Sequence, residues 1–334
     1  MKVIFKKLFV VALAAIPSAA MAQGPNNTGS YYKAADGKSG AKLKTALSSC
    51  VSDHVERSYK QLWDDFRTTD RRDDGKVWDM YSGVTNFTFG TDQAGNYKAE
   101  GDVYNREHSV PKSWFDDAKP MYTDLHHLVP TDGYVNNRRG NYPFGEVGKV
   151  TYESEKGFSK LGSSTTEGYN GVVFEPNDEY KGDFARIYFY MATCYENRVS
   201  TWTGGMFGNG SYPGLSGWAV KMLLQWAKDD PVSEKEINRN NAVYGIQKNR
   251  NPYVDYPGLE QYVWGSLTSK AFSYDHYSDP SASIGSIGTN KQARSVRVYS
   301  ISGVLVRQGN DRAKALSGLS KGIYIVGGKK FVVN

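Results

Sequence analysis

The pair Glu107–His108, in the middle of segment 104–114, is the first place where this sequence could do chemistry. A neutral histidine is the natural proton acceptor near pH 7, and a carboxylate is a preferred ligand of Mg²⁺. Asn136, further along the chain, offers an amide oxygen that could serve as a second ligand. Hydrolysis of a phosphodiester needs a base for the attacking water and a cation for the developing charge. The residue types therefore predict this reaction.

Basic side chains lie close to the pair in the sequence and are candidate phosphate contacts: Arg106, Lys112, Arg138 and Arg139. Arg250 supplies one more strong cation in the loop 249–253. Charged hydrogen bonds from arginine and lysine are the usual way to hold phosphate oxygens. Taken one at a time, each of these residues is as well explained as a solvated charge. Their grouping around Glu107 and His108 favours phosphate binding.

The adjacent histidines His126 and His127 also raise the question of a zinc site. Neighbouring histidines rarely bind one ion with good geometry, and no HExxH motif or cysteine pair completes a tetrahedral set. We therefore expect no zinc there. His126 is expected instead to hold Asp124 or a backbone group near the site.

A strand would point Glu107 and His108 to opposite faces, so one could face a metal while the other faces water. The surrounding pattern predicts helices for much of the body. Expected helical segments are 31–68, 183–192, 215–228, 233–247 and 257–264, with a capping box at Ser233–Glu236 opening the fourth. Segment 145–174 is rich in Gly and Ser and is expected to be irregular or short-stranded.

Composition predicts four parts along the chain. Residues 1–22 read as an export signal, with three lysines, an apolar run too short to span a bilayer, and Ala20-Met21-Ala22 at its end. Residues 23–280 form the expected catalytic domain, and 281–294 form a linker. Residues 295–334 alternate as strands separated by glycines, which predicts a small antiparallel module.

Charge is distributed unevenly over these parts. The net charge is +6, but residues 289–334 carry nine Lys and Arg against one Asp, and the export signal adds three Lys. Residues 23–288 therefore carry −5. Nucleic-acid-binding domains are usually basic overall, so contact with a nucleic acid would need a local basic patch and a metal.

The two cysteines, Cys50 and Cys194, have neither the spacing nor the neighbours of a metal or nucleophile site. An exported protein can form a disulfide. Two buried thiols are equally consistent with the half-apolar helical stretches around them, and the sequence leaves both readings open.

The motifs together resemble the bacterial endonuclease I family, exported nonspecific nucleases of the His-Me finger (ββα-metal) class. The resemblance covers roughly residues 31–266 and rests on REHSVPKSW at 106–114, DLH at 124–126, RGN at 139–141, KGDFAR at 181–186, DPVS at 230–233, RNNAVYGIQ at 239–247 and NRNP at 249–252. It implies an α+β body with several helices, in which a short hairpin carrying His108 packs on a helix carrying Asn136.

By position, the resemblance implies that His108 is the general base and that Glu107 and Asn136 bind Mg²⁺, with Ca²⁺ or Mn²⁺ as alternatives. The Val-Asn order favours Asn136 over its neighbour Asn137. Arg139, and with it Arg250, would hold the nonbridging phosphate oxygens. Members of this family cleave DNA, and many also cleave RNA.

The tail resembles the C-terminal sorting module of type IX secretion, in 298–307, 321–326 and 330–333. An accessory β-module that stays attached is the alternative. The sequence thus predicts a secreted, metal-dependent, sequence-nonspecific endonuclease of DNA and/or RNA without a membrane span, extracellular or periplasmic, with secretion machinery as a partner of the tail. The rival prediction is a secreted polymer- or surface-binding module without catalytic activity.

Overall fold

The computed structural model describes residues 28–208, 210–280, 296–300, 305–309, 318–326 and 329–333. The chain divides into two units, Met1–Ser283 and Ile284–Asn334. The predicted export signal (1–22) and the predicted linker (281–294) lie outside the described residues.

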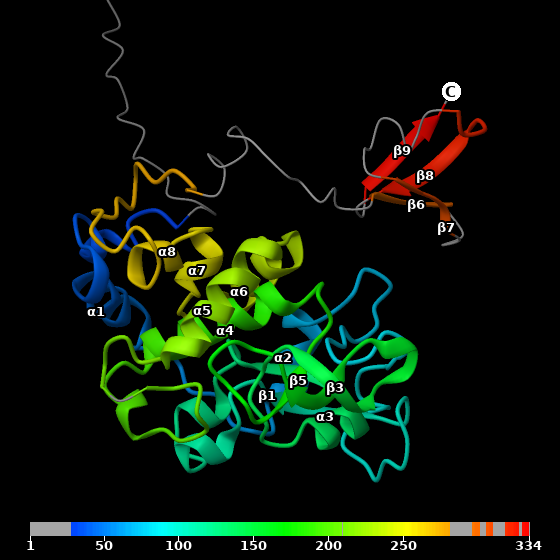
Figure 1. Ribbon diagram of the computed structural model, residues 1–334, viewed down its shortest axis with the longest axis horizontal. Helices are drawn as coiled ribbons and strands as arrows, with labels where there is room; N and C mark the ends of the chain where they lie inside the picture. The colour runs from blue at the N-terminus through cyan, green and yellow to red at the C-terminus, as the bar shows by residue number, and fades with distance from the viewer. Residues whose placement is uncertain are drawn as a thin grey trace, which may run out of the picture. The chain divides into compact units, whose positions relative to one another are not determined.

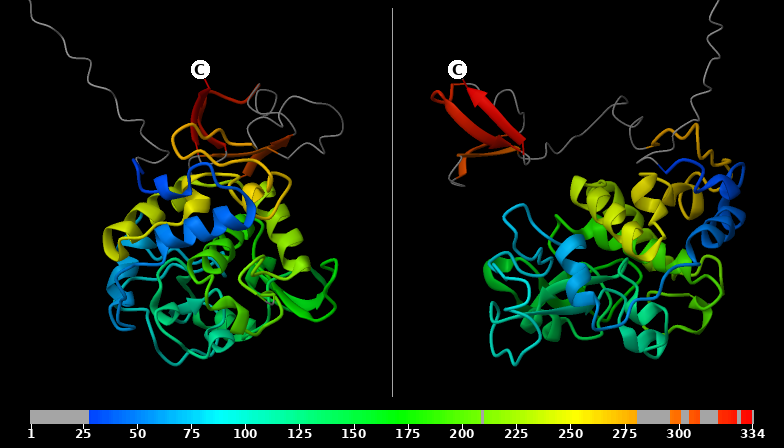
Figure 2. Two further views of the ribbon diagram at one scale, coloured as in Figure 1. Left: turned by 90° about the vertical axis from the view of Figure 1, so that its left-hand side faces the viewer. Right: turned by 180° about the vertical axis from the view of Figure 1, so that it is seen from behind.

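The first unit combines helices with short antiparallel strands, which confirms the predicted α+β class. Helices α1 and α4 to α8 gather on one side of this unit, and α2, α3 and the strands gather on the other (Figures 1 and 2). The helices are α1 (Gly40–Val51), α2 (Leu62–Thr69), α3 (Gly133–Arg139), α4 (Lys181–Cys194), α5 (Gly217–Asp229), α6 (Glu234–Gln247), α7 (Pro252–Asp255) and α8 (Glu260–Val263). The strands are β1 (Tyr104–His108), β2 (Leu128–Asp132), β3 (Val147–Glu153), β4 (Lys160–Ser164) and β5 (Val172–Glu175).

Helix α4 forms the centre of the unit, and every one of its residues is buried. A helix that is largely apolar around its whole circumference must be enclosed by other elements, and α4 contacts α1, α5 and α7. Its charged residues are compensated: Arg186 donates to Glu236, and Lys181 is bound by Glu146 and Glu175. The predicted buried helix at 183–192 is therefore confirmed.

The predicted helix starts and stops are confirmed in part. Ser233 and Glu236 form the predicted capping box at the start of α6, since each side chain bonds the backbone of the other. The continuous helical pattern expected over 31–68 is wrong, because α1 ends at Val51 and α2 begins only at Leu62. The last predicted helix, at 257–264, is present in shortened form as α8, and the short helix α7 before it was not predicted.

Strands β1 and β2 pair antiparallel and lead directly into α3, which gives a β-β-α unit. In this pairing His108 lies opposite Leu128 and Glu107 lies opposite Val129. Asp132 ends β2 and caps α3, because its side chain accepts a hydrogen bond of 2.8 Å from the Val135 backbone N–H. A Cβ at Gly133 would lie 2.9 Å from the ring of Tyr97, so glycine lets Tyr97 pack closely against the start of α3.

Strands β3, β4 and β5 form a second antiparallel sheet in that order. Its strands fall within the Gly/Ser-rich segment 145–174, for which irregular structure or short strands were expected. This sheet adjoins the β-β-α unit through Phe144, which packs against Phe174 of β5 and against the guanidinium of Arg139.

The second unit contains a four-stranded antiparallel sheet with the order β7-β6-β8-β9. Its strands are β6 (Val296–Ser300), β7 (Leu305–Gly309), β8 (Gly322–Val326) and β9 (Lys329–Val333). The predicted small antiparallel module is confirmed as a fold. Its resemblance to a sorting module stays a prediction.

Two further points bear on function. Cys50 and Cys194 are free thiols, one half-buried and one buried, so the structure selects the unbridged alternative. None of the helices among the described residues is both long and apolar enough to cross a membrane.

Candidate active site

Strand β1 carries two chemically different faces, because successive side chains of a strand point in opposite directions. Glu107 belongs to one face and meets Tyr81 and Arg139. Arg106 and His108 share the other face, where both rest against the ring of Tyr59. The predicted separation of Glu107 from His108 is therefore what the hairpin produces.

Glu107 is almost completely buried, at 3% exposure. Its Oε1 accepts hydrogen bonds of 2.7 Å from the Tyr81 hydroxyl and of 2.7 Å from Arg139 Nη1, and Oε2 takes part in neither. Burial raises the pKa of the Glu107 carboxyl, while the charge of Arg139 and the Tyr81 hydroxyl act in the opposite direction. A bound divalent cation would add to that opposing influence and would keep the carboxylate ionised.

Arg139, in the last turn of α3, connects this helix to the end of strand β1 through hydrogen bonds. Besides Glu107, its guanidinium donates to the carbonyl of His108 at 3.0 Å and to that of Ser109 at 2.7 Å. It lies over the ring of Phe144, and only 1% of the residue is exposed. The guanidinium therefore acts inside the protein, on Glu107 and on the backbone, rather than at the surface where a phosphate would arrive.

His108 is held in one tautomer by a backbone carbonyl. Its Nε2 lies 3.0 Å from the Tyr122 carbonyl, which can only accept, so Nε2 carries the proton and Nδ1 keeps its lone pair. Burial is the largest cause that lowers the pKa of His108, to about 3, and the nearby His127 acts in the same direction. The imidazole is thus neutral at pH 7, which is the form a general base requires.

Asn136 and Asn137 occupy different faces of α3. Asn136 is half-buried and precedes Arg139, which contacts Glu107, by three positions, so Asn136 and Arg139 are neighbours on one face of α3. Asn137 is exposed. Carboxylate and amide oxygens are the hard donors that Mg²⁺ prefers, and two protein ligands are usual for this ion. The donor set of Glu107 and Asn136 therefore fits a divalent metal.

The other predicted phosphate contacts lie in three different places. Arg106 and Lys112 lie near His108. Burial and His127 lower the pKa of the His108 imidazole most, and the positive charges of Lys112 and Arg106 lower it further. Arg138 is exposed and stacks on Tyr134 and Tyr152, on the outer side of α3. Arg250 is 5% exposed and is bound by both oxygens of Asp255 at 2.7 Å, so its charge is used within the protein.

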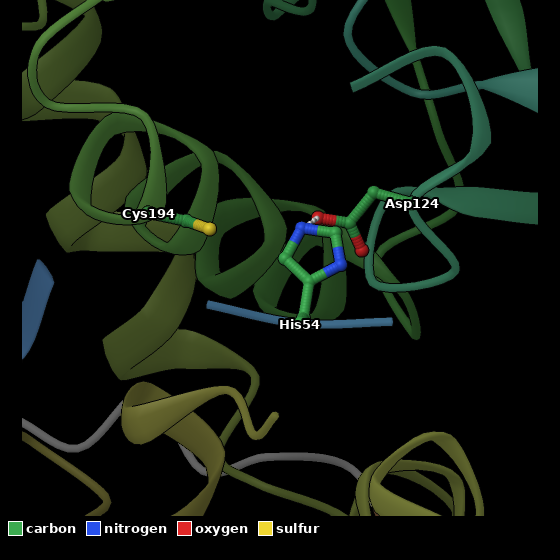
Figure 3. Close-up of side chains that lie close together, drawn as sticks. All are labelled: His54, Asp124 and Cys194. Carbon is green, nitrogen blue, oxygen red and sulfur yellow. Dashed lines mark ion pairs between the residues drawn. The ribbon is translucent and has the colours of Figure 1, made fainter. Parts of the chain in front are cut away.

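A second group of potential metal ligands lies behind the hairpin, where His54, Asp124 and Cys194 offer atoms within 4.8 Å of one another (Figure 3). The Asp124 carboxylate already accepts hydrogen bonds from four donors. The hydroxyls of Tyr190 and Tyr195 reach it at 2.7 and 2.6 Å, and Gln247 Nε2 and the His126 backbone N–H at 2.9 Å. The geometry is that of a buried hydrogen-bonding centre between the segment after α1, helix α4 and the end of α6.

His126 and His127 are both buried. The predicted link to Asp124 is present through the His126 backbone, and the His126 ring lies 3.3 Å from the Asn249 carbonyl. His127 Nε2 donates to the Met121 carbonyl at 2.7 Å. Its ring centroid is 5.6 Å from that of His108, so it packs behind the candidate base.

Sequence reasoning did not find the tyrosines of the site. Tyr81 lies outside the motifs of the sequence, and its hydroxyl donates a hydrogen bond to Glu107. Tyr59 and Tyr122 surround His108 with nearly parallel rings. These residues precede or follow β1 in turn-rich segments, and nothing in their local pattern distinguishes them from the other tyrosines of the chain.

The hairpin of β1 and β2, with Glu107 and His108 at the end of its first strand, leads directly into α3 and so forms a β-β-α arrangement. The family model of endonuclease I matches residues 39–258, so the chain belongs to the endonuclease I family and is a hydrolase acting on nucleic acids. The resemblance inferred from the motifs is thereby confirmed.

Individual relatives agree with this assignment. The chain is 37% identical to an extracellular ribonuclease of Bacillus amyloliquefaciens over 246 residues, which covers 71% of this chain and 79% of the relative. It is 33% identical to an endonuclease-1 of Buchnera aphidicola over 132 residues, or 40% of this chain and 46% of that protein. An extracellular deoxyribonuclease of Aeromonas hydrophila is 25% identical over 140 residues, 42% of this chain and 52% of the relative.

Proposed function

We propose that the protein is a secreted, Mg²⁺-dependent, sequence-nonspecific endonuclease that hydrolyses phosphodiester bonds of DNA and RNA. The observation that carries the proposal is the state of His108, a buried neutral imidazole whose Nε2 proton is held by the Tyr122 carbonyl. Nδ1 is then the one ring nitrogen that can accept a proton. A general base placed in this way contributes roughly 10²–10⁴-fold to a rate.

The chemistry is divided between the two faces of β1. His108 Nδ1 accepts a proton from water as that water attacks phosphorus. Glu107 and Asn136 would hold Mg²⁺. The bound ion would neutralise the negative charge that develops on the phosphate and on the leaving oxygen. Arg139 holds Glu107 Oε1 at 2.7 Å and fixes the strand end through two carbonyls, so it acts as a positioning residue.

Sequence-nonspecific cleavage and export have separate support. The candidate contacts near the site are Arg106 and Lys112, and cations recognise phosphates, which carry no sequence information. Export rests on the predicted signal at 1–22 and on relatives whose names describe them as extracellular. Extracellular release is the proposed destination, and the tail at 295–334 is proposed to engage secretion machinery.

The direct test is incubation of the purified protein with plasmid DNA and with structured RNA, with Mg²⁺ or with EDTA. Cleavage in Mg²⁺ that EDTA abolishes is the expected result. His108→Ala should lose activity by at least about 100-fold. His276→Ala is the matched control, because its side chain is 82% exposed and pairs with Asp275 in a loop. Full activity of His108→Ala would refute the assigned base, and cleavage of neither polymer would refute the function.

A further inference from the structure

The face of β1 that carries His108 continues into a strip of aromatic and cationic side chains. We call this set the stacking strip; its members are Trp63, Arg106, Tyr59, Tyr122 and Lys112. The Arg106 guanidinium carbon lies 3.5 Å from the ring centroid of Tyr59 and 4.2 Å from that of Trp63, so the cation is held between the two rings. At the other end, Lys112 Nζ lies 5.5 Å from the Tyr122 centroid.

The strip reaches the candidate base itself. The ring of Tyr122 lies 5.1 Å from that of His108 with an interplanar angle of 30°, and the ring of Tyr59 lies 6.1 Å away at 20°. The two tyrosine rings are 4.8 Å apart. A base that stacked on these rings would therefore place its own phosphate next to His108.

The side chains of the strip are partly exposed. Tyr59, Trp63, Arg106 and Tyr122 are half-buried, and Lys112, which pairs with Asp117 at 3.0 Å, is 46% exposed at its side chain. Tyr59 and Trp63 pack on the core cluster of Leu62, Phe66 and Tyr104 with their inner surfaces. Their outward parts are fixed by that packing and by Arg106, which also donates to the Tyr59 carbonyl at 2.6 Å. Rings fixed in this way lose little entropy when a ligand stacks on them.

Aromatic rings combined with cations are the arrangement with which proteins hold unpaired nucleotides. Aromatic faces stack on bases of any identity, while the cations between them neutralise the backbone. Bases inside a duplex are stacked on one another and cannot reach such rings without being extruded, which costs a few kcal/mol.

We infer that the stacking strip binds an unpaired base beside the scissile phosphate and makes single-stranded or looped nucleic acid the preferred substrate. The inference rests on the proposed function, since it needs a phosphodiester at His108. Binding can be measured without cleavage, however, so the two proposals can fail separately.

The competing explanation is that Tyr59 and Tyr122 only orient His108. A purely orienting role would lower the cleavage rate of every substrate by the same factor and would leave affinity unchanged. Stacking instead changes affinity and changes it only for substrates that have unpaired bases. The decisive measurement is therefore binding in EDTA, where no cleavage occurs and the orientation of the base has no influence.

The first experiment uses the wild-type chain with three fluorescent ligands in EDTA: a single-stranded oligonucleotide, an abasic strand of equal length, and a duplex of the same sequence. The abasic strand keeps the phosphate charge and lacks the bases. Stacking predicts that the single strand binds roughly 5- to 100-fold more tightly than the abasic strand, the range measured for single base–aromatic stacks. Equal affinity for the two strands would overturn the inference.

The second experiment compares variants in the same assay. Tyr59→Leu and Tyr122→Leu are expected to weaken single-strand binding by at least about fivefold, with little change for the duplex or the abasic strand. Tyr244→Leu is the matched control, because Tyr244 is also partly exposed, also stacks with an arginine, Arg250, and lies on α6. Equal losses for all three ligands, or a loss in the Tyr244 variant as large as in the others, would overturn the assignment.

A cleavage assay with Mg²⁺ completes the test. The wild type should cut the single strand faster than the duplex, and the Tyr59 and Tyr122 variants should raise KM for the single strand more than for the duplex. Loss of kcat alone, equal on both substrates, would identify the rings as positioning residues and refute the substrate preference. A wild type that binds single strands tightly but cuts nothing would refute the proposed function and leave the binding site standing.

Discussion

Arg139 and Glu107 form a buried ion pair, with Nη1 and Oε1 separated by 2.7 Å and both side chains at most 4% exposed. The pair connects the last turn of α3 to β1, the strand that ends at His108. Because Arg139 also donates to the carbonyls of His108 and Ser109, one side chain sets the position of the candidate metal ligand and of the residue that carries the candidate base.

Replacing Arg139 by Met should therefore reduce stability as well as activity. The variant leaves the Glu107 carboxylate buried and without its cation, and breaking a buried pair in this way costs roughly 3–5 kcal/mol. Urea denaturation of the variant and the wild type measures the difference. Arg138→Met is the matched control, since that guanidinium is exposed, and its free energy of unfolding should stay close to that of the wild type. Similar losses for the two variants would contradict the assigned role.

The neighbouring asparagines of α3 allow a direct test of the metal ligand. Asn136→Ala should raise the Mg²⁺ concentration for half-maximal cleavage by at least about tenfold, since even outer partners of metal sites contribute 10- to 100-fold. Asn137→Ala should leave it unchanged, because Asn137 is exposed on another face of the helix. Titration of cleavage with Mg²⁺ distinguishes the two. If Asn137 proves to be the sensitive position, the proposed ligand set is incorrect.

The sequence predicted the class of protein and its most local features better than it predicted contacts. The capping box of Ser233 and Glu236 follows from side chains three positions apart, and the buried helix at α4 follows from an almost continuous apolar run. Such features depend on neighbours along the chain. The break between α1 and α2 was missed because the apolar residues on either side of it repeat with one helical period.

The chemistry of Glu107, His108 and Asn136 could be proposed from residue types and motifs, but their environment could not. The partners of Glu107 are Tyr81 and Arg139, which lie 26 and 32 positions away. Arg139 looked like a phosphate contact because a charged residue is usually exposed. Its burial depends on Phe144 and on two backbone carbonyls, contacts that exist only once the hairpin and helix have packed.

The hydrogen bonds to the buried carboxylate of Asp124 should make a large contribution to the free energy of unfolding. Tyr195→Phe removes the 2.6 Å hydrogen bond to Asp124 and the 3.1 Å contact with His54 Nε2 while keeping the ring. A hydrogen bond to a charged group contributes roughly 1.5–3 kcal/mol, so the free energy of unfolding should fall by about that amount. Thermal and urea denaturation would show it. Tyr244→Phe, at a tyrosine that is 40% exposed, should change stability by less than about 0.5 kcal/mol.

Glu260, at the start of α8, predicts a pH dependence of stability. The residue is 5% exposed, and burial raises the pKa of its carboxyl to about 7 from the ordinary 4.5. Between these values the folded state binds a proton that the unfolded state has lost. The stabilising contribution is therefore complete below pH 4.5 and disappears as the pH rises through 7. Glu260→Gln mimics the protonated form at every pH. It should match the wild type at pH 4.5 and exceed its free energy of unfolding at pH 8 by up to about 3 kcal/mol.

The measurement is urea denaturation of both proteins at several values between pH 4.5 and pH 8, and the result is the difference between them at each pH. Taking the difference removes the contribution of other buried carboxyls, such as that of Asp79, whose pKa burial also raises to about 7. Glu155→Gln, at an exposed glutamate, is the control for the exchange of glutamate for glutamine itself. A difference for Glu260→Gln that does not change with pH would mean that Glu260 ionises in the fold as readily as in the unfolded chain.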